Sequence, residues 1–140
     1  MHQHHQHHFT SHDDTALFYQ HWAAAQPESE KKAILLFHRG HEHSDRMAHL
    51  VEELKLPQFD FFAWDARGHG ESPGERGDAP SFSACVKDIQ YFVRHIEQEY
   101  GITEQNIAII GQSVGAVLAA TWVHDYAPKI RALCLASPAF

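Results

Sequence analysis

The amino-acid sequence predicts an α/β fold with a doubly wound, mainly parallel sheet that opens with an antiparallel hairpin. One observation is an alternating stretch at residues 9–22, which Asp13 and Asp14 interrupt as a turn would. A second is a change from a β-branched run to small and apolar residues across a glycine-flanked turn within residues 107–121. The third is that continuous apolar runs of strand length alternate with segments of helical periodicity; these runs lie at residues 33–37, 59–64, 107–110 and 130–136.

Length and composition bound the function. The 140 residues, 44% of them hydrophobic, are enough for one domain with a core and too few for two. Eighteen acidic residues against eleven basic ones give a net charge of −7, which disfavours binding to nucleic acid or to an anionic membrane. We find no signal-peptide pattern and no transmembrane stretch of about 20 apolar residues, so we expect a cytoplasmic protein.

The first eight residues form a low-complexity segment with five histidines and two glutamines. We expect residues 1–8 to be a His-rich disordered tail and residues 9–140 to be the folded domain. Histidine-rich tracts can bind divalent metals. No carboxylate or cysteine at ligand spacing accompanies this one, so we expect neither a metal site nor a cofactor.

The first half of the domain should supply the hairpin, two buried strands and one helix. We place the hairpin strands near residues 9–11 and 16–21, and the buried strands at residues 33–37 and 59–64. Ser44 is a candidate cap for the intervening helix, which Pro57 closes. The apolar stripe of this helix consists of Met47, Leu50, Val51 and Leu54.

The second half contains the clearest helical period of the chain. A helix should begin near Pro80 and Ser81 and end at Gly101. Its apolar positions are Phe82, Cys85, Val86, Ile89, Phe92, Val93, Ile96 and Tyr100. A second helix should run to about Tyr126, before a last strand at residues 130–136. We interpret Cys85 and Cys134 as buried thiols on core faces and not as a disulfide.

A lone serine sits in the turn between the strand at residues 107–110 and the helix that follows. The turn reads Gly111-Gln112-Ser113-Val114-Gly115, which is the pattern of a nucleophile elbow. The backbone turns so sharply in such an elbow that side chains at Gly111 and Gly115 would collide with neighbouring backbone. The segment therefore predicts a nucleophilic serine.

Three segments in this order resemble the α/β-hydrolases of the monoacylglycerol-lipase-like and lysophospholipase-like group, also described as serine aminopeptidase S33 domains. Residues 38–44 (His-Arg-Gly-His-Glu-His-Ser) resemble that group's His-Gly-x-Gly-Glu-His-Ser loop. Residues 65–72 resemble its Asp-x-Arg-Gly-His-Gly-x-Ser loop, and residues 111–115 match its elbow. The resemblance implies a truncated α/β-hydrolase fold, with residues 9–140 as the N-terminal part of the domain.

The resemblance also implies roles. Ser113 would be the nucleophile, and the backbone N–H groups of Val114 and Gly40 would form the oxyanion hole. Arg39 stands where the family usually has glycine, so it either alters the loop and brings a cation to the mouth or points to solvent. The residues with an implied structural role are His38, Asp65, Arg67, Gly68, His69, Gly70, Gly111 and Gly115.

The rest of a catalytic triad has no place in the sequence. After Ser113, where the family carries its acid and base, the candidates are His124 and Asp125. Eleven residues of helix put His124 about 16 Å along the axis from the serine. We therefore expect a surface position for both and little activity in this chain alone.

Three function classes remain open at this point, of which the third, metal handling by the His-rich segment at residues 1–8, rests on composition alone. The first is a serine hydrolase of acylglycerol, lysophospholipid or another small ester, completed by a C-terminal half. The second is a non-catalytic hydrolase fragment or partner-binding module that uses its open edge at residues 130–136. The sequence does not distinguish lipid, peptide and small-ester substrates, since no segment that would shape an acyl pocket is identifiable.

Overall fold

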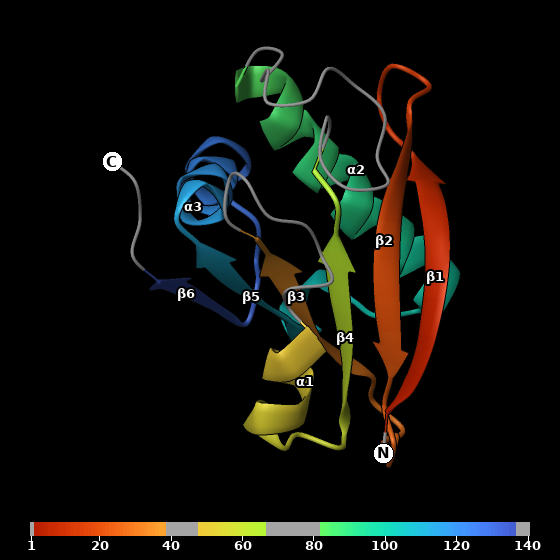
Figure 1. Ribbon diagram of the computed structural model, residues 1–140. Coiled ribbons are helices and arrows are strands. Elements are labelled where there is room, and N and C mark those ends of the chain that lie inside the picture. Colours follow the sequence, from red (N-terminus) through yellow and green to blue (C-terminus); the bar gives the residue numbers. More distant parts are fainter. Residues whose placement is uncertain (1, 39–47, 67–81, 137–140) are drawn as a thin grey trace.

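The computed structural model describes residues 2–38, 48–66 and 82–136. Within them a single six-stranded sheet has the order β1-β2-β4-β3-β5-β6 and carries helices on both faces (Figure 1). Its strands are β1 (Gln3–Thr10), β2 (Ala16–Ala23), β3 (Lys32–Phe37), β4 (Phe59–Trp64), β5 (Ile107–Gln112) and β6 (Ala132–Ala136). The helices are α1 (Ala48–Leu54), α2 (Phe82–Tyr100) and α3 (Val114–Tyr126), with a short 3-10 turn at Glu104–Asn106.

The strand directions confirm the predicted fold class. β1 and β2 form an antiparallel hairpin, and β2 also pairs antiparallel with β4. The pairs β3–β4, β3–β5 and β5–β6 are all parallel. The carboxyl ends of the parallel strands therefore lie side by side, and the segments that follow them meet there; we call this the carboxyl edge of the sheet.

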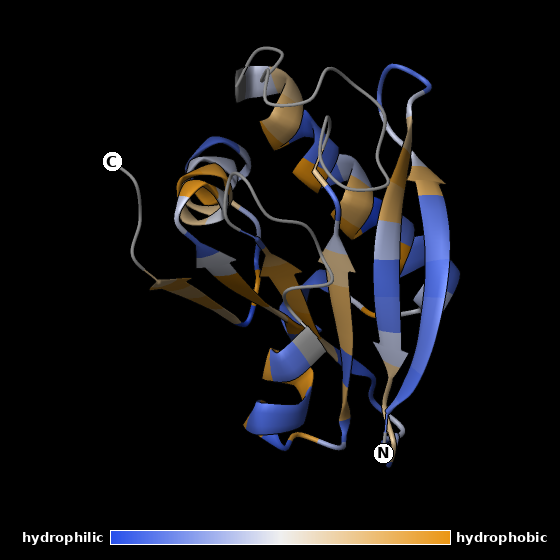
Figure 2. Ribbon diagram, in the orientation of Figure 1, coloured by the Kyte–Doolittle hydropathy of each residue, from blue (hydrophilic) through white to orange (hydrophobic). Residues whose placement is uncertain are grey.

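Alternate side chains of the central strands feed two separate cores. Leu35 and Phe37 point into the larger core, which α2 and α3 cover, whereas Ile34 and Leu36 point into a smaller core closed by Val51 of α1. This two-sided burial explains why β3 and β4 are apolar along most of their length, as Figure 2 shows. Among the described helices, none is long and apolar enough to span a membrane.

The prediction that residues 1–8 form a disordered tail is wrong for most of these residues. β1 begins at Gln3 and pairs with β2 along all eight of its residues, from Gln3 opposite Ala23 to Thr10 opposite Ala16. The histidines of β1 lie against aromatic rings of β2: His4 stacks on Trp22 at 5.0 Å between ring centroids. Backbone pairing and ring contacts thus order a polar segment whose composition alone predicts disorder. Figure 2 shows how hydrophilic β1 is.

Other boundaries follow the prediction with small shifts. α2 ends before Gly101, which has φ +67° and donates its N–H to the Glu97 carbonyl, and α3 ends at Tyr126 as predicted. The last strand begins two residues later than expected. Cys85 is buried as predicted but Cys134 is exposed, because the described residues cover β6 on one side only; the two thiols form no disulfide. The predicted helix cap Ser44 and the stripe residue Met47 lie outside the described residues.

Candidate active site

Ser113 occupies the turn between β5 and α3 in a backbone conformation that residues other than glycine rarely adopt. Its backbone angles are φ 56° and ψ −118°, and such an angle in a residue other than glycine stores strain that its surroundings must hold. Hydrogen bonds on both sides hold it. The Ser113 N–H donates to the Ala136 carbonyl of β6 at 3.0 Å, and its carbonyl accepts the N–H of Ala116 in the first turn of α3 at 3.0 Å.

The two flanking glycines are required by close backbone contacts, as the sequence predicts. A Cβ on Gly111 would lie 2.8 Å from the Cα of Ala116 and from the Gly115 carbonyl oxygen. A Cβ on Gly115 would lie 2.5 Å from the carbonyl oxygens of Phe37 and His38. The second contact brings the start of α3 directly against the end of β3, where the candidate oxyanion loop begins.

His38 and Asp65 follow β3 and β4 at the same edge of the sheet. The His38 ring is buried, and its Nε2 accepts the backbone N–H of Ala66 at 3.0 Å. Asp65 is also buried, and its N–H donates to the Phe18 carbonyl of β2 at 2.9 Å. Since Nε2 is an acceptor, the His38 ring carries its proton on Nδ1 when neutral. His38 therefore connects the ends of two strands, as a structural histidine would.

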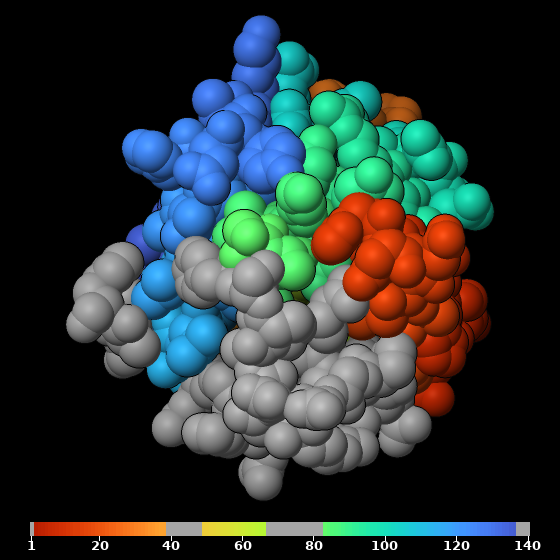
Figure 3. All heavy atoms as spheres, turned by 90° about the horizontal axis from the view of Figure 1, so that it is seen from above, coloured from red at the N-terminus to blue at the C-terminus, as the bar shows by residue number. Residues whose placement is uncertain are grey.

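The structure gathers several predicted site residues at the carboxyl edge of the sheet. Ser113 is half-buried there, and Val114 begins α3 with its side chain exposed. Figure 3 looks onto the molecule from above and shows the start of α2 lying between the hairpin and α3. Five predicted site residues lie outside the described residues, together with Arg39: Gly40, Arg67, Gly68, His69 and Gly70.

His124 and Asp125 are surface residues of α3, as expected. The His124 side chain is 89% exposed, and its Nδ1 lies 3.0 Å from Asp125 Oδ1. Both residues belong to the last turn of α3, whereas Ser113 precedes its first turn. Neither side chain can reach the serine, because the length of the helix separates them.

Sequence reasoning missed a polar cluster between the hairpin and α2. The Tyr19 hydroxyl hydrogen-bonds His95 Nε2 at 2.9 Å and the Tyr100 hydroxyl at 2.7 Å. Burial lowers the pKa of His95 and raises the pKa values of Tyr19 and Tyr100. The helical period of α2 marks Tyr100 as a core position. Only the fold shows that Tyr19 of β2 lies beside it.

Two further pairs depend on contacts that are distant in sequence. His21 Nε2 lies 2.7 Å from Asp60 Oδ2, and the buried Asp88 of α2 accepts the Ser11 hydroxyl of the hairpin turn. Across the described ranges, no three His, Cys, Asp or Glu side chains already converge as a metal centre. The strand register of the hairpin, had it been predicted, would have placed His5 opposite His21.

Comparison with known proteins gives the same family over most of the chain. Residues 28–140 match the family model described as serine aminopeptidase, S33. The chain is 58% identical to the Escherichia coli protein YnbC over 135 residues, which are 96% of this chain and 23% of that protein. It is 28% identical to the monoglyceride lipase of Rattus norvegicus over 94% of this chain and 42% of the lipase.

Solved structures share the fold at low sequence identity. The α/β-hydrolase GrgF from Penicillium sp. sh18 superposes with a TM-score of 0.82 at 18% identity, over 97% of this chain and 46% of that one. The Pyrococcus furiosus esterase Pf2001 superposes with a TM-score of 0.78 at 20% identity, over 98% of this chain and 52% of the esterase chain. The chain thus spans about half the length of these structures and less than half of the curated relatives. It belongs to the serine aminopeptidase S33 family of α/β-hydrolases, whose relatives here include lipases.

Proposed function

We propose that the chain is the nucleophile-bearing part of a serine hydrolase that cleaves carboxylic esters. The observation that carries this proposal is the strained turn at Ser113, held between β5 and α3 with φ 56°. A turn that needs glycine on both sides and strains its central residue has little use in stabilising a fold. In such a turn the serine hydroxyl would face a substrate carbonyl at the carboxyl ends of the parallel strands.

Attack by the Ser113 hydroxyl would place a negative charge on the substrate oxygen. The Val114 N–H, at the start of α3, would donate to this oxygen, and the helix N-terminus favours negative charge there. The Gly40 N–H would be the second donor. Support for this role comes from the contact of Gly115 with Phe37 and His38, which sets the beginning of that loop against α3. One such donor is worth about 3 kcal/mol in comparable enzymes.

The acid and base of the triad must come from outside these 140 residues. His124 and Asp125 are exposed at the far end of α3, and the histidine of this fold follows the serine in sequence. We propose that a complementing C-terminal half supplies both groups. Loss of the histidine lowers turnover about 10⁶-fold in a comparable serine protease, so this chain alone should be nearly inactive.

The relatives support a proposal for the substrate class. Monoglyceride lipases match more than nine-tenths of this chain, and esterases share its fold. We propose a small ester substrate of the acylglycerol or lysophospholipid type.

The test compares this chain alone with a fusion in which it replaces the matching segment of YnbC. The high identity to YnbC makes this protein a compatible source of the remaining domain. We expect turnover of a p-nitrophenyl ester and of a monoacylglycerol by the fusion, and none by the chain alone above its Ser113→Ala control. The matched control is Ser83→Ala, at an exposed position of α2, which should leave turnover unchanged.

Three results would each contradict a part of the proposal. Equal turnover by the fusion and its Ser113→Ala variant would show that Ser113 is not the nucleophile. A folded fusion without activity, beside an active YnbC, would favour a non-catalytic module that binds a partner. Ser113-dependent turnover by the chain alone would leave the nucleophile in place but refute the argument for a missing base.

A further inference from the structure

We propose that three histidines on one face of the β1–β2 hairpin, His5, His7 and His21, form a binding site for a divalent transition metal such as Zn²⁺. Side chains two residues apart on a strand share a face, so His5 and His7 point to the same side of the sheet. The register places His5 directly opposite His21. Imidazole nitrogen is a preferred ligand of Zn²⁺, and three histidines with one water are a known coordination set.

The His5 ring lies nearly as close to each of the other two rings as in a metal-bound set. The His5 ring centroid lies 6.1 Å from that of His7 and 5.9 Å from that of His21. Two imidazoles bound tetrahedrally to one Zn²⁺ have centroids about 5.2 Å apart, given Zn–N distances near 2.0 Å. The described side chains do not yet converge on one point. These two distances exceed the metal-bound value by less than about 1 Å, and the side chains of His5 and His7 are exposed and can rotate toward His21.

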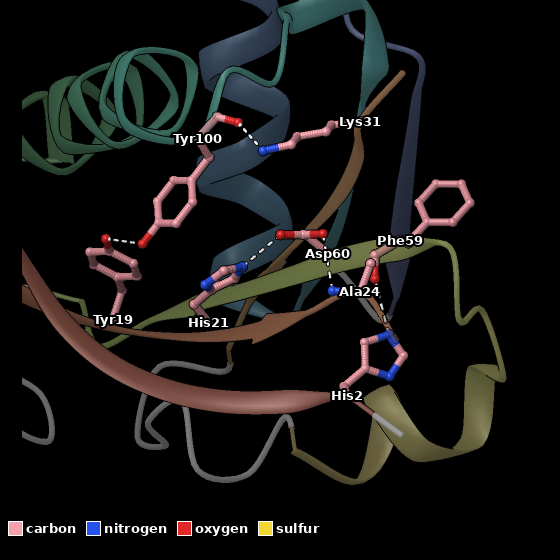
Figure 4. Close-up of polar contacts among 8 residues, drawn as sticks. All are labelled: His2, Tyr19, His21, Ala24, Lys31, Phe59, Asp60 and Tyr100. Atoms are coloured by element: carbon pink, nitrogen blue, oxygen red, sulfur yellow. Dashed lines mark hydrogen bonds and ion pairs between the residues drawn. The ribbon is translucent and has the colours of Figure 1, made fainter. Parts of the chain in front are cut away.

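His21 is already oriented as a metal ligand would be. Its Nε2 lies 2.7 Å from Asp60 Oδ2, and its ring stacks on Phe62 at 4.4 Å between centroids. Asp60 is itself held by the Ala24 N–H at 3.1 Å. In Figure 4 the other ring nitrogen of His21 points away from Asp60. A carboxylate that accepts one ring N–H and leaves the other nitrogen with its lone pair is the usual support of a metal-binding histidine.

The neighbourhood leaves a route for the ion. A hollow of about 440 Å³ lies beside His7 and is lined by His7, His8, Tyr19, His95, Glu99 and Tyr100. The hollow gives solvent and metal access to the His7 ring, and an entry path is one requirement of a metal site.

The position of the site separates it from ester hydrolysis. The three histidines lie in β1 and β2, whereas Ser113 follows β5, and β4 and β3 lie between these two parts of the sheet. The metal would therefore bind two intervening strands away from the elbow. Bound there, it would link β1 to β2 and stabilise the edge of the sheet, because an ion that binds only the folded state raises its stability.

The test is calorimetric titration of the 140-residue chain with Zn²⁺, beside two double variants that remove the same number of histidines from the same strand. His5→Gln with His7→Gln removes two proposed ligands. His4→Gln with His8→Gln removes two histidines from the opposite face, which contact Trp22 and Phe18. Gln3 and Gln6 already lie in β1, so the strand accepts glutamine. Far-ultraviolet circular dichroism checks that each variant is folded.

We expect one Zn²⁺ per chain, at least a tenfold weaker affinity in the His5/His7 variant and an unchanged affinity in the His4/His8 variant. Zn²⁺ should also raise the melting temperature of the original chain and of the His4/His8 variant, but not of the His5/His7 variant. Asp60→Asn should weaken binding about 10- to 100-fold, since it alters the support of His21. Equal losses in both double variants would show that histidine content alone attracts the ion and would overturn the site, as would no binding by the original chain.

Discussion

At Gly115 the backbone of α3 approaches that of β3 so closely that only a hydrogen atom fits on the Cα. The added methyl group of Gly115→Ala would lie 2.5 Å from two backbone carbonyl oxygens, which cannot move as a flexible side chain can. We expect this variant to lower the free energy of unfolding by about 2–3 kcal/mol. Urea denaturation followed by circular dichroism measures the change.

Gly101→Asn is the control for that substitution. Gly101 has a positive φ, but a Cβ added there would meet no atom within 4 Å, and asparagine accepts this conformation better than other residues. The expected loss is below about 1 kcal/mol. If Gly115→Ala proves no more destabilising than Gly101→Asn, the close approach of the two backbones is not as described.

His38 offers a second prediction for a single residue. Replacing it with leucine leaves the buried Ala66 N–H without its acceptor, and an unsatisfied buried donor costs about 1–3 kcal/mol. His38→Leu should therefore lower the urea midpoint. His124→Leu, at a side chain that is 89% exposed, should change the free energy of unfolding by less than about 0.5 kcal/mol. Similar midpoints for the two variants would refute the role of His38 in joining β3 to β4.

The residue scale also shows where sequence reasoning succeeds. The glycine-flanked turn was predictable because its five residues form a local pattern, and the backbone contacts at both glycines confirm that no side chain fits there. The Tyr19–His95 bond was not predictable, because its two residues are 76 positions apart and no local pattern joins them.

Among the elements, β1 departs most from its composition. Six of its eight residues are histidine or glutamine with exposed side chains before Phe9 enters the core, which alone favours a disordered segment. Pairing with β2 supplies the backbone hydrogen bonds, and Phe9 stacks on Phe92 of α2 at 4.9 Å to anchor the end of the strand. Tertiary contacts therefore decide the structure of an element whose own residues do not.

The packing of α2 on the hairpin should depend on pH. Burial lowers the pKa of His95 below 6.5 in the folded state, although the Glu99 carboxylate opposes the shift and His7 adds to it. Between the lowered pKa of folded His95 and pH 6.5, the unfolded chain thus binds more protons than the folded chain. The contribution of His95 to stability is therefore complete above pH 6.5 and is lost as the pH falls through the pKa of the folded state.

Urea unfolding at pH 7.5 and pH 5.5 tests this dependence. We expect a lower free energy of unfolding at pH 5.5, and a smaller decrease in His95→Gln, whose amide oxygen can still accept the Tyr19 hydroxyl. The matched control, His124→Gln, replaces a histidine that is exposed on α3. A decrease of the same size in both variants would show that His95 does not titrate as described.

For the whole molecule, the positions of the parallel strands follow from the sequence more readily than the extent of the sheet. The apolar runs predicted every parallel strand, and β3, β4 and β5 contribute residues to the cores on both faces of the sheet. The segments that carry Gly40 and Arg67 do not follow from periodicity, because loop residues form no repeating contact with a core. Their place in the candidate site therefore rests on the family resemblance.

The sheet ends at β6, whose outer edge is unpaired among the described residues. Unpaired strand edges promote association with other chains, and a lysine on such an edge opposes it. We expect the chain alone to self-associate with rising concentration, and Cys134→Lys, at an exposed position of β6, to reduce the association. Gln6→Lys on the other edge strand, β1, should change little, because that strand is already polar.

Light scattering against concentration measures this association. A chain that stays monomeric at every concentration would contradict the prediction. An equal effect of the two lysine substitutions would show that added charge alone prevents association, whichever edge carries it.

The central claim is that Ser113 is the nucleophile, and covalent labelling tests it most directly. The fusion with YnbC is treated with a fluorophosphonate, digested and mapped by mass spectrometry. The account predicts one adduct on the peptide that contains Ser113, absent from Ser113→Ala and retained in Ser83→Ala. An adduct on another residue, or equal labelling of the Ser113→Ala variant, would contradict it.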